Sequence, residues 1–168
     1  MRSQFEALSE SARVFRMARI GGGFLPAGHL LPKPEWLEPD PQDIAEGERS
    51  GRPAGISVWD VALAKHEDAC WIRQVHVGEQ TSFSAEVGRL KHVAGQHQRE
   101  LAIVADPLPS PSADPRWETL EEAQRASISS TAGGHTLVEG VRRPAGVSKG
   151  AHKSFREELA QEFERLAG

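Results

Sequence analysis

The chain has 168 residues and a formal net charge of −4 at pH 7. This length suits one domain with a core of its own, so we expect residues 1–168 to form a single domain. The acidic excess excludes a protein that attracts nucleic acid or anionic membranes over its whole surface, since such attraction needs clustered positive charge. No apolar run approaches the roughly 20 residues of a membrane helix, so we expect no membrane partner.

Two further features bear on the compartment. The N-terminal residues carry charges at close spacing, which leaves no uncharged core for a secretory signal peptide. Cys70 is the only cysteine, which excludes a disulfide within the chain and a cysteine-rich zinc site. We therefore expect a cytoplasmic protein.

The first predicted element is a helix over residues 3–20. Ser3 and Glu6 have the spacing of a capping box, apolar residues recur on one helical face as far as Phe15, and Gly21 would end the helix. The alternative is a strand over residues 14–20, in which alternate side chains would share a face.

Residues 21–55 form a proline-rich, acidic loop. Six prolines lie in it, each lacking an amide donor and restricting the residue before it, so regular structure should be sparse. Apolar residues such as Trp36 and Leu37 lie among the acidic ones. They indicate that the loop packs against the domain rather than acting as a linker.

The middle of the chain predicts short alternating elements. Residues 56–59 suit a buried strand, 60–74 a helix, 75–77 a strand, and 87–95 a short helix. The helix over 60–74 rests on four residues that share one helical face, Trp59, Leu63, His66 and Cys70.

The second half has two clear strand patterns. The apolar run over residues 101–105, ended by an Asp-Pro pair, is typical of a central strand, and residues 136–141 alternate as a further strand. A helix over 115–126 begins at an aspartate cap, and residues 127–134 are small enough to form a flexible loop.

A final helix carries Phe155 and Leu159 toward the core, with acidic residues facing outward. Together the elements predict an α+β fold, in which helices cover a small mixed sheet that includes residues 101–105 and 136–141.

The C-terminal quarter contains a basic segment, which has no carboxylate between Val141 and Arg156. Cations at a helix start oppose the helix dipole, and free amides with nearby cations are what a phosphate or carboxylate needs. The basic segment is therefore our candidate binding site for an anionic partner. Its members are Arg142, Arg143, Lys149, Lys153 and Arg156.

Two simpler interpretations compete with that site. The acidic residues between Glu35 and Glu48 could fold over the basic segment and neutralise it within the molecule. Ser154 could cap the last helix with Glu157 at capping-box spacing, which would leave Lys149 and Lys153 as ordinary solvated charges.

A second set of candidates suits nucleophilic catalysis. Cys70 with His66 or His76 could form a thiolate pair, and His135 follows a run of hydroxyl residues and glycines. Burial of His66 and Cys70 in the core is the simpler interpretation, because both continue the apolar stripe. The run before His135 is also ordinary loop chemistry.

The sequence gives little support for a metal site or a cofactor site. The spacing of His66, Cys70 and His76 is weak evidence for zinc, and the glycines at 21–23 lack the spacing of a dinucleotide fold and the lysine of a P-loop. We expect no metal and no cofactor. Asp106, at the end of the clearest strand, is the carboxylate best placed for a ligand site, although it could simply terminate the strand.

Three functions are left open. The leading hypothesis is a non-enzymatic binding or accessory module that engages nucleic acid or an acidic protein surface through the basic segment. The alternatives are a small cysteine- or histidine-dependent hydrolase or transferase, and a structural subunit of a protein complex whose proline-rich loop orders against another chain.

Overall fold

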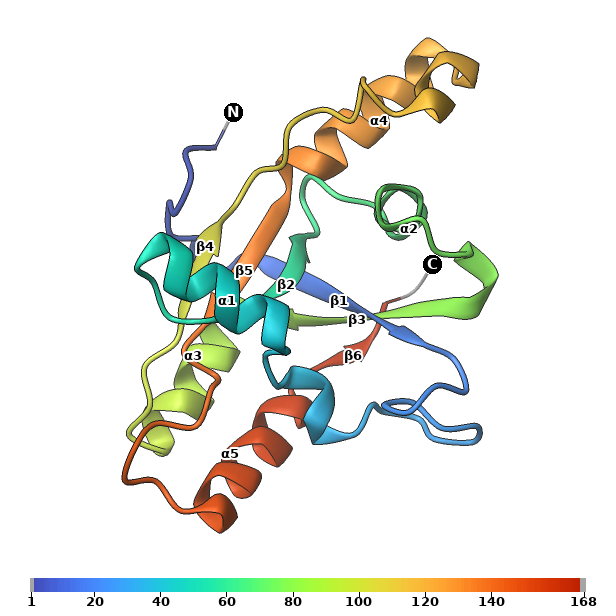
Figure 1. Cartoon of the computed structure of the whole chain (residues 1–168). Coiled ribbons are helices and arrows are strands. Elements are labelled where there is room, and N and C mark those ends of the chain that lie inside the picture. Colours follow the sequence, from blue (N-terminus) through green and yellow to red (C-terminus); the bar gives the residue numbers. More distant parts are fainter. Residues whose placement is uncertain (1, 167–168) are drawn as a thin grey trace.

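The computed structural model describes residues 2–166, which contain a six-stranded sheet in the order β4-β5-β2-β1-β3-β6 (Figure 1). Every neighbouring pair is antiparallel. The α+β class is thus confirmed, with an antiparallel sheet in place of the mixed one. The strands are β1 (Arg13–Arg19), β2 (Gly55–Asp60), β3 (Gln80–Glu86), β4 (Ala102–Ala105), β5 (His135–Glu139) and β6 (Glu164–Arg165).

Helices surround the sheet. Figure 1 shows α3 and α5 together at the bottom, and α2 and α4 at the top right. The α-helices are α1 (Pro41–Ser50), α2 (His66–Arg73), α3 (Val87–Gln96), α4 (Glu122–Gly133) and α5 (Lys149–Gln161). Three short 3-10 helices complete the fold, η1 (Pro34–Leu37), η2 (Val77–Glu79) and η3 (Pro115–Thr119).

The apolar core divides into a large and a small cluster. The large cluster joins alternate residues of the strands, such as Val14 and Val58, to Phe155 and Leu159 of α5. Its burial confirms the predicted inward face of the last helix. The small cluster is centred on Phe15 and Trp59, which point to the opposite side of the sheet.

The N-terminal prediction was wrong in type. Residues 13–19 form β1, which pairs along its whole length with β3, from Arg13 opposite Glu86 to Arg19 opposite Gln80. The alternative, a strand near residues 14–20, is therefore correct. A strand wins because both of its sides are buried, which a helix with one apolar stripe would not achieve.

The proline-rich loop contains a helix that the sequence analysis did not predict. Pro41 occupies the first turn of α1, where a missing amide costs nothing, and Asp40 and Asp43 form a reciprocal capping box. Gly51 ends the helix in the left-handed conformation. The prolines thus define the start of α1 instead of excluding regular structure.

Strand β4 confirms the apolar run at 101–105 but lies at an edge of the sheet, not at its centre. The N-terminal segment covers that edge. The amide of Phe5 donates to the Ala105 carbonyl at 2.6 Å, and that of Leu8 donates to Ile103 at 3.0 Å. This cover explains why an edge strand has the composition of a central one.

Strands β2 and β5 confirm the patterns at 56–59 and 136–141, and α3 confirms the short helix near 87–95. The expected helix over 60–74 is shortened to α2, because Asp60 accepts backbone amides in a turn before it. The strand expected at 75–77 is absent, and the strand there begins at Gln80 as β3.

The helix predicted over 115–126 is divided. Asp114 caps the short η3, and α4 begins only at Glu122 and runs through the stretch expected to be a flexible loop. Residues of this stretch pack the helix against the domain, since Ile128, Thr131 and Ala132 are buried.

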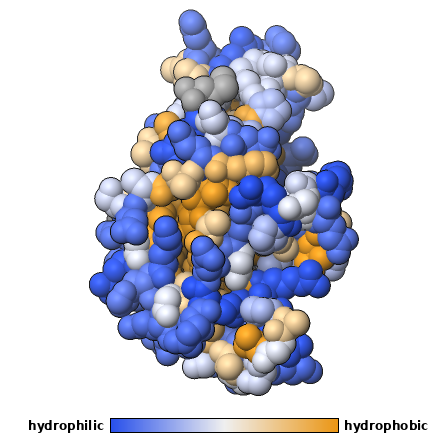
Figure 2. Space-filling model, turned by 90° about the vertical axis from the view of Figure 1, so that its left-hand side faces the viewer, coloured by the Kyte–Doolittle hydropathy of each residue, from blue (hydrophilic) through white to orange (hydrophobic). Residues whose placement is uncertain are grey.

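The surface is mainly hydrophilic on the side that lies at the left of Figure 1, with a hydrophobic area in its middle (Figure 2). Among residues 2–166, no helix combines the length and apolar character needed to cross a membrane.

Candidate functional site

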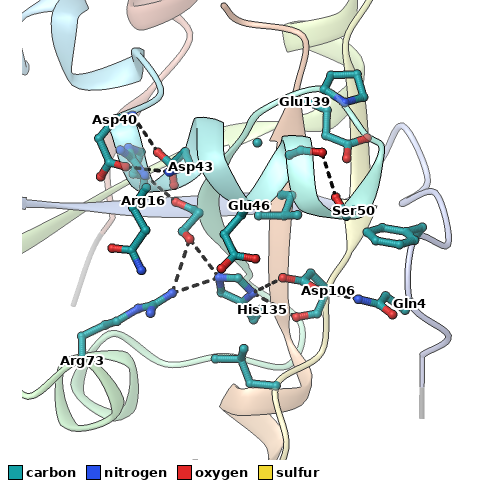
Figure 3. A pocket seen from close by; sticks show the side chains of 18 residues that line it. Gln4, Arg16, Asp40, Asp43, Glu46, Ser50, Arg73, Asp106, His135 and Glu139 are labelled. Carbon is teal, nitrogen blue, oxygen red and sulfur yellow. Dashed lines mark hydrogen bonds and ion pairs between the residues drawn. The ribbon is translucent and has the colours of Figure 1, made fainter.

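A cavity of about 520 Å³ lies between α1 and the strands β2 and β5 (Figure 3). Its walls also include Gln4 from the N-terminal segment, Arg16 of β1 and Arg73 of α2. Because seven separate segments meet here, the cavity depends on the tertiary fold and has no local sequence motif.

The register of β2 and β5 places polar side chains on the cavity face. Ser57 lies opposite Leu137 and Trp59 opposite His135, so Ser57 and His135 are diagonal neighbours on one face. The intervening residues, such as Val58, point into the large apolar cluster. Strand alternation therefore exposes Ser57 to the cavity while the rest of β2 is buried.

Ser57, His135 and Asp106 form a hydrogen-bonded series. The Oγ atom of Ser57 is 3.0 Å from Nε2 of His135. On the other side of the imidazole, Nδ1 is 2.9 Å from the Asp106 carbonyl oxygen and 3.3 Å from its Oδ2 atom. The His135 side chain is buried, and Trp59 packs against it edge to face at 5.0 Å. The ring is thus fixed in orientation.

Arg73 determines which imidazole nitrogen accepts. Its Nη2 atom is 3.0 Å from His135 Nε2 and 3.3 Å from Ser57 Oγ. A guanidinium is only a donor, so Nε2 carries a lone pair, and the proton resides on Nδ1, which donates to Asp106. Nε2 of His135 therefore faces both a hydroxyl and a cation.

Asp106 is held in its ionised form. The hydrogen bond with His135 lowers the pKa of this carboxyl below its ordinary value, against the opposing effect of burial. Gln4 donates to its Oδ1 atom at 3.2 Å. The carboxylate is consequently a fixed negative partner for His135.

Neither arginine of the cavity forms a salt bridge within residues 2–166, although the nearby charge of Asp43 acts to raise the pKa of both. Arg16 donates to the backbone carbonyls of Trp36, at 3.1 Å, and Ser57, at 2.6 Å. Burial lowers the pKa of Arg16 to about 10, and burial also lowers the pKa of Arg73. Within residues 2–166, no carboxylate lies within 4.0 Å of either guanidinium.

The acidic residues around the cavity are engaged elsewhere. Asp40 and Asp43 accept each other's backbone amides, and burial raises the pKa of Asp43. Glu46 pairs with Arg49 at 2.7 Å, and Glu139 forms a two-fold pair with Arg52 at 2.7 and 2.8 Å. Each of these carboxylates already has a donor, whereas the cavity arginines contact carbonyl, hydroxyl and imidazole groups.

The cysteine and histidine candidates separate in the structure. His66 lies near Cys70, with 3.7 Å between Nε2 and Sγ, but Cys70 is buried and its pKa is raised by burial. That direction opposes thiolate chemistry. His76 accepts the amide of Gly78 in a turn. His135 lies in the cavity on β5, whereas His66 contacts Ser82 of β3, and β2 and β1 lie between those strands.

The basic segment is only partly paired. Arg156 lies 2.9 Å from Glu38 and 4.0 Å from Glu35, so the acidic loop neutralises this one member. Lys153 is 3.9 Å from Glu157 of the same helix. The remaining members are exposed, with no ion pair within residues 2–166, and these are Arg142, Arg143 and Lys149.

The cap of α5 also differs from the expected one. Ser148 accepts the amide of Ala151 at 3.1 Å, whereas Ser154 lies inside the helix. Lys149 is therefore the first residue of α5, and Lys153 follows one turn later.

Sequence analysis identified His135 and Asp106 separately and missed Ser57, Arg73 and Arg16. One signal was present, since Ser57 is the single hydroxyl inside the apolar stretch of β2. The two arginines carried no such signal, because Arg16 reaches the cavity where β1 and β2 stop pairing, beyond Val14 and Phe15.

In the described part of the chain, no group of three or more histidine, cysteine, aspartate or glutamate side chains is arranged to hold a metal ion. Comparisons of the chain with models of protein families, with curated proteins and with solved structures found no match. The function is therefore inferred from the geometry of the cavity.

Proposed function

We propose that this protein binds a small polar molecule through an anionic group, a phosphate or a carboxylate, in the cavity beside α1. One observation carries the proposal: two guanidinium groups line a single cavity, and neither has a carboxylate partner within residues 2–166. Arg16 is half-buried, and a charged group removed from water is normally paired, because desolvation without a partner costs free energy. Arg73 is exposed, and its charge adds to that of Arg16 in the same cavity.

An anion would supply the missing partner. Arginine binds phosphate and carboxylate through parallel hydrogen bonds, which are stronger when both groups are charged. Ser57 and the polar edge of His135 add hydrogen-bonding groups that orient a ligand. The carboxylates of α1, which already accept hydrogen bonds, also restrict which ligands fit. A second negative group on the ligand would lie near Asp43 and be repelled.

The test uses pairs of compounds that differ by one anionic group, glucose 6-phosphate with glucose and adipate with adipamide. The anionic member of at least one pair should raise the melting temperature and bind in calorimetry, while the neutral members should not. Arg73→Gln should weaken that binding by about 10-fold or more, since a hydrogen bond to a charged group is worth about 1.5–3 kcal/mol.

Arg142→Gln is the matched control, because it removes an exposed guanidinium outside the cavity and should leave the binding unchanged. Equal binding of neutral and anionic members, or equal loss in both variants, contradicts the proposal.

A second candidate function keeps the basic segment, because Arg142, Arg143 and Lys149 are exposed and unpaired within residues 2–166. Here the partner would be nucleic acid or an acidic protein surface. Charge reversal at Arg142, Arg143 and Lys153 should abolish salt-sensitive binding to duplex DNA or to polyglutamate and leave the melting temperature within a few degrees. Binding that survives the reversal rejects this function.

A further inference from the structure

The hydrogen-bonded series at the cavity has the order of a nucleophile, a base and an orienting group. Ser57 Oγ faces His135 Nε2 at 3.0 Å, and Asp106 holds the opposite nitrogen through both its carbonyl and its carboxylate. A serine hydroxyl becomes a nucleophile when an adjacent base can take its proton. These distances meet that requirement without any rearrangement of the backbone.

We propose that Ser57 is the nucleophile of an esterase or acyltransferase that acts on esters carrying an anionic group. This inference rests on the proposed function, because the anionic group of the substrate would occupy the place beside the cavity arginines. His135 is the general base, and Asp106 is a positioning residue that keeps the imidazole proton on Nδ1.

The resting contact of Arg73 explains why an anion is needed. Its guanidinium competes with the Ser57 hydroxyl for the lone pair of His135 Nε2. A substrate anion that draws the guanidinium away leaves Nε2 to accept the Ser57 proton.

The reaction then proceeds in two balanced steps. Ser57 Oγ bonds to the carbonyl carbon as its proton passes to His135 Nε2, and the bond to the leaving oxygen breaks as that oxygen takes the proton. The acyl group is now an ester of Ser57. A water, or an acceptor alcohol in a transferase, attacks this ester, gives its proton to His135, and the proton returns to Ser57 as the product acid or new ester leaves.

The position of Ser57 separates this arrangement from a purely structural hydrogen bond. Ser82 also meets an imidazole, that of His66, whereas Ser110 meets only Ser129, in an exposed contact at 2.9 Å. Ser57 is half-buried, lines the cavity and meets both a base and a cation. A buried structural histidine needs no such access to a ligand.

The experiment compares the mono-4-nitrophenyl ester of adipic acid with 4-nitrophenyl hexanoate, which has a similar chain length and lacks the carboxylate. With the full chain, the adipate ester should release a burst of one nitrophenolate per molecule, and mass spectrometry should find the adipyl group on Ser57. Ser57→Ala should abolish the burst, and His135→Gln should slow it by about 100-fold or more. Ser110→Ala should change neither.

Asp106→Asn tests the positioning role. It should slow the burst by about 10-fold or more, with the KM for the adipate ester and the affinity for adipate unchanged, since Asn keeps the shape but not the charge. A matching fall in binding would instead indicate a disturbed cavity and overturn this role.

The outcomes separate this inference from the function on which it rests. If adipate binds through Arg73 but no ester acylates Ser57, the nucleophile is rejected and anion binding stands. If both esters acylate Ser57 at equal rates, the nucleophile stands and the anionic requirement is rejected. Acylation at any residue other than Ser57 overturns the inference.

Discussion

The two faces of the sheet are built on different principles. One face, covered by α3, α5 and η1, buries a continuous apolar cluster in which Phe83, Phe155 and Leu159 are almost inaccessible. The other face has only a small apolar cluster around Phe15 and Trp59, and it carries the polar cavity beside it. The difference shows that stability and ligand chemistry are assigned to opposite sides of the same strands.

The apolar face should therefore dominate folding. Phe155→Ala should lower the free energy of unfolding by about 3–5 kcal/mol, because it leaves a cavity in a closed cluster. Leu137→Ala, on the cavity face, should cost only about 1 kcal/mol, because that side chain is half-exposed already. Chemical denaturation followed by tryptophan fluorescence measures both.

Equal losses for the two variants would contradict the division between the faces. The slope of unfolding against denaturant serves as the control, since an unchanged slope shows that both variants unfold from the same native state.

The polar face should respond to acid more than the apolar one does. The bond with His135 lowers the pKa of Asp106 in the folded protein below the ordinary value of 3.8, so its ionised form stabilises the fold above that value. This contribution is lost as the pH falls through the lowered pKa. The melting temperatures of the natural chain and of Asp106→Asn should therefore differ near neutral pH and converge below about pH 4.

Melting curves at several pH values on the two proteins supply the comparison. A gap that stays constant down to about pH 3 would mean that Asp106 gains nothing from ionisation in the folded state.

The same two faces explain what the sequence could and could not predict. Apolar periodicity located β2, β4, β5 and the inward residues of α5. Each of these segments is buried against a shared core, so each has its own pattern of apolar residues. The periodicity failed for β1, whose charged residues include Arg16, since that side chain serves the cavity and not the core. Pro41 misled the prediction for α1, because a proline can begin a helix as readily as it prevents one.

The candidate site was predicted only in fragments. His135 and Asp106 stood out one at a time, but nothing in the linear spacing joined them to Ser57, which lies 78 residues before His135. Strand register brings them together. The basic segment, by contrast, was visible at once because its charges are adjacent in sequence, and Glu38 removed Arg156 from it only through folding.

The N-terminal segment that lies along β4 links self-association to the chemistry of the cavity. By occupying the free hydrogen-bonding groups of an edge strand, it denies that edge to a second molecule and so acts against aggregation. The same few residues bring Gln4 to Asp106. Removing these residues would expose the hydrogen-bonding groups of β4 and would also remove the Gln4 donor from Asp106, which supports the imidazole of His135. An affinity tag is therefore better fused at the other terminus.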